Sequence, residues 1–477
     1  MTCIINKSFE TGSFPLQFKS VNILPIIKGT SKDPEELQNY RPIANIKFFA
    51  KISERIATSQ LQEYLRQFNL YPKVQSAYRK FHSVETALVR VTNDILVSLD
   101  KGEEVILVLL DYSSAFDALN HDTLLNRLSQ RFGIQGKALA WFRSYLLGRT
   151  QRVVIGENKS TDHVVTHGVP QGSVLGPVLF LLYTSPLEDL INSFGVQQMF
   201  YADDTQLYLA FKKNDIMNVI PKIVSCIQAI EKWSICNGLK LNSAKTEFLH
   251  ITSRFRAVEP IQSLDLDGTK ILAANTCRNL GITLDDKLVM EKFVSQKCSS
   301  ASFALYKIGK IRDFIDKDTA ERLVHAFVMC HLDFCNGLLC GLPAKHIKRL
   351  QTIQNSAARV ISKIKKHEHI TPVLRNLHWL PVQTRIQFKI LLLAYECFYL
   401  LAPQYLIDLL QIYTPDRNLR SKGKDLFVIP NRKTKFYGER TFVYNASILW
   451  NNLPQNLRQI TDINKFKSAL KTHFFKL

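Results

Sequence analysis

The chain has no long hydrophobic run. Its apolar stretches, such as 105–110 and 178–183, are far shorter than the roughly 20 residues that a membrane-spanning helix needs. The chain also does not open with a basic segment followed by an apolar one, as a secretory leader would. These absences argue against a membrane partner and predict a soluble, intracellular protein that resides in the nucleus or the cytoplasm.

Cysteine is too irregularly placed for a disulfide framework. Nine cysteines, an odd number, are scattered from Cys3 to Cys397 without paired spacing, which indicates reduced thiols. Cys330, Cys335 and Cys340 form a cluster, but their five-residue spacing matches neither a zinc knuckle nor a zinc finger. We therefore expect packed thiols at these positions in preference to a metal site.

Internal repeats and low-complexity segments are also absent, whereas positive charge is abundant. The 477 residues, 46% of them hydrophobic, suffice for two or three domains. The net charge is +21, and the segment from Gly341 to the end carries +16 of it, with 23 Lys and Arg against 7 Asp and Glu. This excess predicts a polyanionic partner. A lysine-rich solvated face and membrane-surface binding are the alternatives.

Hydrophobic periodicity predicts a mixture of helices and strands. In chain order the expected elements are extended pieces within 17–42, helices at 48–65 and 84–99, a strand at 104–110, helices at 115–132 and 137–147, paired strands at 151–155 and 163–166, a helix from 174, a hairpin at 198–211, a helix at 216–236, a turn and strand at 239–251, a strand at 278–284, and helices over 292–335 and 350–364.

Acidic side chains occupy rigid positions in this pattern. The apolar segment 104–110 reads as a buried strand and ends at Asp111, and Asp203 and Asp204 lie near the turn of the hairpin. If the two strands are neighbours, the three carboxylates converge, and such oxygen ligands suit two Mg2+ ions about 4 Å apart. Each feature alone has a plainer explanation, because acids are common in turns and an Asp after a strand often caps the next helix.

Several short motifs follow one another in a definite order. They are DYSSAFD at 111–117, GVPQGS at 168–173 and YADD at 201–204, joined by NYRPI at 39–43, QSAYR at 75–79, LNSAKT at 241–246, NLGI at 279–282, HWLPV at 378–382 and LWNNLP at 449–454. In this order they closely resemble the motifs of reverse transcriptases of non-LTR (LINE, jockey-type) retrotransposons. The resemblance covers essentially the whole chain.

The resemblance implies an α+β fold of the right-hand polymerase type. Residues 1–284 would form the fingers (about 1–101) and a palm of antiparallel sheet plus helices (about 102–284). A helical thumb at 285–340 and a basic, mainly helical nucleic-acid-binding extension at 341–477 would follow. Because the extension has no recognisable Cys-His knuckle, we expect RNA binding there from the basic surface and from stacking aromatics such as Trp379, Tyr437 and Trp450.

The same resemblance implies which residues carry the chemistry. Asp111, Asp203 and Asp204 would hold two Mg2+ ions, with Mn2+ as a possible substitute, and the backbone carbonyl of Tyr112 would be an additional oxygen ligand. Lys245 would donate a proton to the departing pyrophosphate.

Four further residues would contact the nucleotide. Phe116 would press on the sugar and exclude a ribose hydroxyl, although core packing in a helix is its plainer explanation. Lys28 and Arg41 would grip the triphosphate, with a plain surface lysine as the alternative for Lys28. Gln171, in a glycine-flanked loop, would support the incoming nucleotide and the template.

The predicted function is therefore RNA-directed DNA synthesis, in which a DNA primer is extended with deoxynucleotides on an RNA template. One alternative is a catalytically inactive retrotransposon remnant that only binds nucleic acid, and another is an RNA-dependent RNA polymerase, which Phe116 disfavours. Members of the family usually carry an endonuclease ahead of the polymerase. None is expected in this chain, so a separate endonuclease is a possible partner. The sequence does not indicate an oligomeric state.

Overall fold

The computed structural model describes residues 2–29, 31–113, 115–266, 268–414 and 425–476, and a four-stranded antiparallel sheet lies at its centre. The strand order is β11-β3-β9-β8, with bounds Glu247–Ile251, Glu104–Leu110, Asp204–Phe211 and Gln197–Tyr201. Strand β3 pairs with β9 along its whole length, from Glu104 opposite Phe211 to Leu110 opposite Thr205. The predicted buried strand and hairpin are confirmed, and they are neighbours in one sheet.

Helices α3 (Val84–Lys101) and α8 (Ile216–Cys236) accompany this sheet. Helix α3 begins at a capping box, in which the Ser83 hydroxyl accepts a hydrogen bond from Thr86 N and the Thr86 hydroxyl accepts one from Ser83 N. It ends at Gly102, whose φ of 89° is the left-handed conformation that glycine tolerates best. Both predicted helices are confirmed, and the bounds of α8 agree with the prediction.

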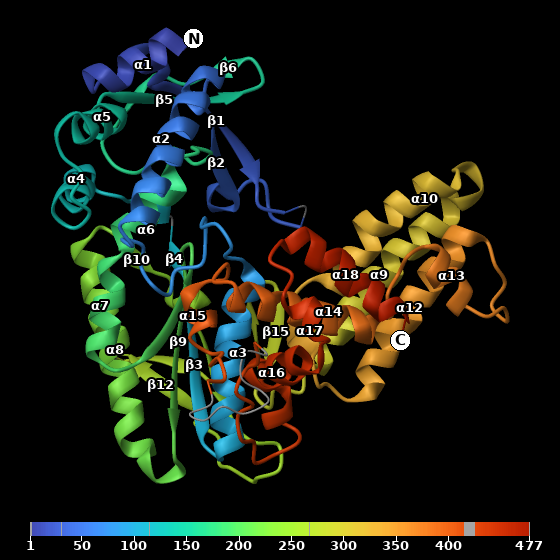
Figure 1. The fold of residues 1–477 in the computed structure, drawn as a ribbon. Helices are drawn as coiled ribbons and strands as arrows, with labels where there is room; N and C mark the ends of the chain where they lie inside the picture. Colours follow the sequence, from blue (N-terminus) through green and yellow to red (C-terminus); the bar gives the residue numbers. More distant parts are fainter. Residues whose placement is uncertain (1, 30, 114, 267, 415–424, 477) are drawn as a thin grey trace.

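The alternation of side chains along β3 creates two separate hydrophobic cores. Val105 and Leu107 belong to the core that contains the buried residues of α3, whereas Ile106, Val108 and Leu110 belong to the core that contains those of α8. Successive side chains of a strand point to opposite faces, so a wholly apolar strand needs cover on both sides. The sheet is therefore a middle layer between the two helices (Figure 1).

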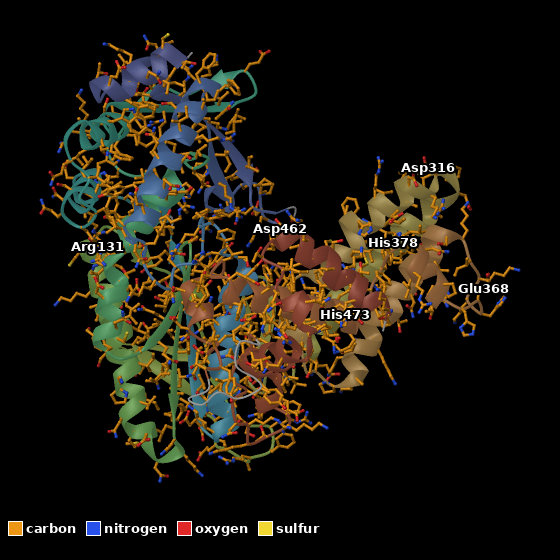
Figure 2. The ribbon with its side chains drawn as sticks, in the orientation of Figure 1. Arg131, Asp316, Glu368, His378, Asp462 and His473 are labelled. Carbon is orange, nitrogen blue, oxygen red and sulfur yellow. The ribbon has the colours of Figure 1, made fainter. Side chains whose placement is uncertain are left out.

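A second sheet and several helices precede and flank the central sheet. The strand order of this second sheet is β2-β1-β5-β6, with β7 paired to β5. The elements of this part are α1 (Thr2–Thr11), β1 (Ser20–Ile27), β2 (Tyr40–Asn45), α2 (Phe48–Gln67), α4 (His121–Gln130), α5 (Gly136–Leu146), β5 (Arg149–Ile155), β6 (Asn158–Lys159), β7 (His163–Val165), α6 (Gly176–Thr184) and α7 (Pro186–Ser193). Arg131, labelled in Figure 2, follows α4 and forms an ion pair with Asp189 of α7 at 2.7 Å.

The remaining elements are short strands and a largely helical second half. They are β4 (Tyr112–Ser113), β10 (Lys240–Leu241), β12 (Ser263–Leu266), β13 (Thr269–Leu272), β14 (Thr276–Asn279), β15 (Ile282–Asp285), α9 (Glu291–Ile311), α10 (Lys317–Val324), α11 (Cys330–Asp333), α12 (Ala344–Ser362), α13 (Thr371–Asn376), α14 (Val382–Phe398), α15 (Gln404–Ile407), α16 (Phe442–Asn452), α17 (Gln455–Arg458) and α18 (Ile463–Lys476). Helices α9, α10, α12 and α13 form a lobe on the right of Figure 1.

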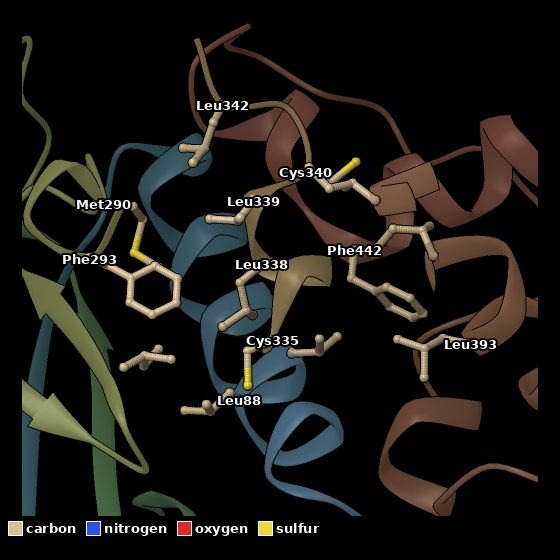
Figure 3. Packing of buried hydrophobic residues seen from close by; sticks show 14 of the residues in the cluster. Leu88, Met290, Phe293, Cys335, Leu338, Leu339, Cys340, Leu342, Leu393 and Phe442 are labelled. Carbon is tan, nitrogen blue, oxygen red and sulfur yellow. The ribbon is translucent and has the colours of Figure 1, made fainter. Parts of the chain in front are cut away.

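The C-terminal helices pack against α3 instead of extending away from the body. The Tyr405 hydroxyl lies 2.6 Å from Ser76 Oγ and 2.9 Å from Thr86 Oγ1, and Asp100 accepts a hydrogen bond from Thr434 N at 2.6 Å. Figure 3 shows the apolar side of this contact, where side chains of the C-terminal helices, such as Phe442 of α16, face α3 across one core. The end of the chain is thus part of the structure that supports the central sheet.

The three aromatic residues predicted to stack on RNA are buried, so that prediction is wrong. Trp379, Tyr437 and Trp450 are 3%, 1% and 0% exposed. Trp450 lies 5.3 Å from the ring of Phe398 and donates to the carbonyl of Asp425, and Tyr437 OH accepts a hydrogen bond from a backbone N–H. Large aromatic rings contribute most apolar area when they are enclosed, and here they form the core of the C-terminal segment.

Two predicted elements also differ from the structure. The predicted helix at 115–132 begins only at His121, because the Asn120 side chain accepts a hydrogen bond from Thr123 N and caps the helix there. The predicted strand at 278–284 is two strands, β14 and β15, joined by a turn in which Leu280 and Gly281 have φ of 46° and 85°. Positive φ at both positions is typical of a tight hairpin turn.

The α+β class predicted for the chain is confirmed, with an antiparallel sheet at the centre and helices around it. Cys335 and Cys340 are packed thiols in the core, as expected, while Cys330 is exposed. Within the described ranges, no helix combines the length and apolar character that crossing a bilayer requires.

We expect the stability of the fold to decrease in mild acid. Burial, together with the charge of Arg79, lowers the pKa of His82 to about 4, and burial also lowers the pKa of His121 and His346. An unfolded histidine titrates near pH 6.5, so the unfolded chain binds more protons below that pH. The stability present above pH 6.5 is therefore lost as the pH falls toward 4.

Thermal unfolding midpoints measured between pH 7.5 and 5 would check this expectation. His82→Gln should reduce the drop in the unfolding midpoint as the pH falls. His369→Gln, at an exposed position, should leave that drop unchanged. An equal pH dependence in the wild type and in His82→Gln would contradict the explanation.

Candidate active site

The register of the central sheet brings Asp111 next to Asp204. Leu110 at the end of β3 is opposite Thr205 near the start of β9, so the next residue of β3 and the preceding residue of β9 are neighbours. Asp203 lies in the two-residue turn between β8 and β9, beside Ala202, which has a φ of 57°. The three predicted metal ligands therefore come from one end of one sheet.

These carboxylates influence one another electrostatically. Burial raises the pKa of Asp203, and the negative charge of Asp111 raises it further. Burial also raises the pKa of Asp204 to about 6, with additional contributions from Asp203 and Asp111, although part of the Asp204 side chain remains exposed. Crowded acids with raised pKa values are stabilised when a cation compensates their charge.

Lys245 supplies a positive charge to this group. It lies in the 3-10 turn Ser243–Lys245, just ahead of β11, whose Glu247 pairs with Leu109 of β3. Its Nζ is 2.7 Å from Asp111 Oδ2, yet this oxygen has no hydrogen-bond partner among the described residues. The ammonium group is therefore at ion-pair distance from Asp111 without being aligned for a hydrogen bond.

The donor chemistry of these acids fits Mg2+, although they do not form a ready-made cage. In the described part of the chain, no group of three or more His, Cys, Asp or Glu side chains is arranged to hold a metal ion. Even so, Asp111 Oδ2 accepts no hydrogen bond from the described residues, and the mutual repulsion of the carboxylates favours a divalent cation. Oxygen ligands of this kind are those that Mg2+ prefers.

The loop 168–171 packs on the segment that follows Asp111. Phe116 is half-buried, its ring centroid is 4.9 Å from that of Phe180, and its carbonyl accepts a hydrogen bond from Val169 N at 3.0 Å. Gly168 has a φ of 79°, and a Cβ at this position would lie 2.7 Å from the carbonyl oxygen of Asp117. A glycine is therefore needed for this close approach.

Gln171 joins the same loop to strand β2. Its carbonyl accepts a hydrogen bond from Ala44 N at 2.7 Å, and its buried side-chain Oε1 has no partner among the described residues. Gly172 follows with a φ of 114°, where a Cβ would lie 3.0 Å from the carbonyl oxygen of Ala44. This contact connects the predicted nucleotide-supporting residue to the strand that carries Arg41.

Lys28 and Arg41 come from the β1–β2 hairpin and are both exposed. Arg41 is opposite Ile26 in this hairpin, and Lys28 follows β1 directly, where its backbone N–H donates to the carbonyl of Asn39 at 2.8 Å. The Lys28 ammonium donates to the carbonyl of Gln38 at 2.7 Å. The two predicted triphosphate ligands thus both belong to the β1–β2 hairpin.

Tyr112 directs its side chain into the core. It is 5% exposed, and its hydroxyl lies 3.4 Å from Ser234 Oγ. Burial raises the pKa of Tyr112 to about 12. The phenol therefore does not take part in the site, and the expected ligand role concerns its backbone carbonyl alone.

Two glutamine contacts that the sequence analysis did not assign support the aspartate hairpin. Gln75 Oε1 accepts a hydrogen bond from Ala202 N at 3.1 Å, and Gln75 Nε2 donates to the carbonyl of Ala202 at 3.2 Å. Gln206 of β9 accepts a hydrogen bond from Asn279 at 2.8 Å. Gln75 belongs to the motif QSAYR and Asn279 to the motif NLGI, so both motifs were visible in the sequence. The structural roles of these residues depend on contacts that only the fold creates.

We expect Gln75→Ala to loosen the turn that carries Asp203. The substitution removes both hydrogen bonds to Ala202, so the ends of β8 and β9 should open more often. Hydrogen exchange of a peptide covering 199–206 should become faster. Gln404→Ala, at an exposed position, is the matched control, and unchanged exchange in Gln75→Ala would contradict this role.

Comparisons with known proteins identify the family of the chain and several of its relatives. Residues 28–284 match the family described as reverse transcriptase (RNA-dependent DNA polymerase). The chain is 26% identical over 402 residues to a probable RNA-directed DNA polymerase from transposon BS of Drosophila melanogaster, covering 81% of this chain and 43% of that protein. It is 28% identical over 300 residues to the RNA-directed DNA polymerase from mobile element jockey of the same species, covering 62% and 32%.

A solved structure of apo telomerase from Candida tropicalis is also similar, with 11% identity, a TM-score of 0.42, and coverage of 77% of this chain and 63% of that one. The chain spans less than half the length of the curated relatives described above. The family match alone spans more than half of the chain. The expected resemblance is confirmed, and the chain belongs to the reverse transcriptase (RNA-dependent DNA polymerase) family.

Proposed function

We propose that the chain is an RNA-directed DNA polymerase of a non-LTR retrotransposon, which extends the 3′ hydroxyl of a DNA primer on an RNA template with deoxynucleoside triphosphates. The observation that carries the proposal is the pairing of β3 with β9, which makes Asp111 and Asp204 neighbours in a chain of this family. The sequence relatives named above as RNA-directed DNA polymerases support it.

Asp111, Asp203 and Asp204 are the residues that would hold two Mg2+ ions, for which Mn2+ could substitute, with the Tyr112 carbonyl as a further oxygen ligand. Such ions activate the primer hydroxyl and compensate the charge of the phosphates. Lys245 balances the charge of Asp111 in this structure. In our proposal it also donates a proton to the departing pyrophosphate.

The remaining residues would position the nucleotide. Arg41 and Lys28, from the β1–β2 hairpin, would bind the triphosphate. Phe116, supported by Phe180 and held by Val169, would press on the sugar, and Gln171 would support the nucleotide and the template. An RNA template, a DNA primer and deoxynucleotides are thus the proposed partners.

We further propose the domain division that the resemblance implies, with fingers at about 1–101, palm at about 102–284, thumb at 285–340 and the basic region at 341–477. The helical lobe that begins at α9 supports the boundary between palm and thumb. The alternative of an inactive remnant is not favoured, because the acids of the site are intact and its supporting hydrogen bonds are formed.

Primer extension on an RNA template with Mg2+ tests the proposal. Asp203→Asn and Asp204→Asn should each lower the rate by at least about 10²-fold, because each removes a carboxylate proposed to hold the ions that stabilise developing charge. Asp408→Asn, at an exposed position, should retain wild-type activity. Absence of extension by the wild type, or equal activity in the aspartate variants, would overturn the proposal.

Phe116→Ala should weaken discrimination between deoxynucleotides and ribonucleotides. The smaller side chain would leave room for a 2′ hydroxyl, so the ratio of kcat/KM for the two nucleotides should fall by about 10-fold or more. Phe116→Tyr keeps the bulk of the ring and should remain selective. A Phe116→Ala enzyme as selective as the wild type would show that this ring does not contact the sugar.

A further inference from the structure

A cleft of about 280 Å3 lies between the sheet of β1, β5 and β7 and the loop 168–171. Pro42 and Gln171 are among its lining residues, so the cleft adjoins the residues proposed to contact the nucleotide. One wall is aliphatic and includes Val21, Ile23 and Val153. The opening is thus large enough for part of a nucleotide and is continuous with the candidate site.

A buried guanidinium without an anionic partner lines this cleft. Arg149, the first residue of β5, is 1% exposed, and its Nη1 donates to the carbonyl of Tyr145 at 3.1 Å. Its Nε and Nη2 have no hydrogen-bond partner among the described residues, where it also forms no ion pair. The Tyr145 ring, 4.9 Å away, offers a cation–π contact but no charge. An uncompensated buried charge is costly, and an anion would relieve that cost.

The buried carboxylate of Glu54 does not supply that anion. Its Oε2 accepts hydrogen bonds from the Ser173 hydroxyl at 2.9 Å and from Val174 N at 2.7 Å, and its Oε1 accepts one from the Tyr145 hydroxyl at 3.3 Å, so both oxygens already have partners. Asp117 is the one acid among the described lining residues, and it is exposed. Arg152, His163 and His167 line the same cleft and add to its capacity for an anion.

Another buried arginine shows what is particular to Arg149. Arg440 is 5% exposed, and its Nε and Nη1 also lack partners among the described residues. The cavity beside Arg440, however, has a volume of about 10 Å3, which has no room for a phosphate. The two arginines share burial and missing partners, and only Arg149 adjoins a space that a ligand could occupy.

We propose that this cleft is a phosphate-binding subsite, in which the free nitrogens of Arg149 bind a phosphate oxygen pair and the aliphatic wall contacts the attached sugar or base. A guanidinium fork suits such two-point contact with phosphate. The inference rests on the proposed function, since it concerns the substrates of the same site. The phosphate comes either from the nucleic-acid strand or from the incoming nucleotide.

Binding of a labelled RNA template annealed to a DNA primer, measured by fluorescence anisotropy without metal or nucleotide, distinguishes these sources. If the strand supplies the phosphate, Arg149→Gln should weaken binding about 5- to 10-fold and reduce the salt dependence by about one phosphate contact, a slope of roughly 0.7. If the nucleotide supplies it, strand affinity should be unchanged and KM for deoxynucleotides should rise by a similar factor. Arg440→Gln is the matched control and should change neither constant.

A folded Arg149→Gln protein with unchanged strand affinity and unchanged KM would overturn the proposal, because the guanidinium would then serve the core alone. If this variant does not fold, an exposed position tests the same cleft. Val153→Glu, at a lining residue that is 41% exposed, should cause the same loss through charge repulsion. Val164→Glu, 69% exposed on β7 and outside the cleft lining, should not. Equal constants in these two variants and the wild type would also overturn the subsite.

The strand-binding measurement is independent of catalysis. A wild-type chain that binds the template–primer through Arg149 but does not extend it would retain the subsite and overturn the proposed polymerase activity. A chain that extends primers, but whose strand affinity and KM are insensitive to both Arg149→Gln and Val153→Glu, would retain the proposed polymerase activity and overturn the subsite.

Discussion

The antiparallel pairing of β3 with β9 is the constraint on which the site depends. It places the end of one strand beside the start of the other, so Asp111 and Asp204 meet without any contribution from loop flexibility. Strand β11 pairs with the other edge of β3 and brings Lys245 to Asp111. A shift of one residue would exchange the two faces of β3 and move each side chain out of the core in which it packs, so the fit of both cores holds this register.

The same burial explains why the C-terminal segment matters to a site that lies far from it in sequence. One face of β3 is covered by α3, and α3 is in turn covered by helices from the end of the chain. Tyr405 contacts both Thr86 of α3 and Ser76, whose backbone N–H donates to the carbonyl of Phe200 in β8. A continuous series of contacts therefore leads from the C-terminal helices to the hairpin that carries Asp203.

The cations of α12 and three large aromatic rings occupy different places in that C-terminal segment. Its basic residues include Lys345, Lys348 and Arg349, which are exposed on α12, whereas Trp379, Tyr437 and Trp450 are enclosed. A polyanion would thus meet cations on this surface without these three rings. Near the candidate site, by contrast, the cation of Arg149 is itself enclosed. It lies within cation–π distance of the rings of Phe14 and Tyr145.

The sequence alone determined the local elements and the identity of the chemical groups. Apolar continuity marked β3, alternation and a short turn marked the β8–β9 hairpin, and the ordered motifs predicted the acids. It did not determine the late start of α4, which depends on the Asn120 cap, or the turn between β14 and β15. Tertiary structure decided which strands are neighbours, that the C-terminal aromatics are core residues, and that Gln75 holds the aspartate turn. The physical reason is that periodicity reports which face of an element is apolar, whereas only packing decides which distant segment covers that face.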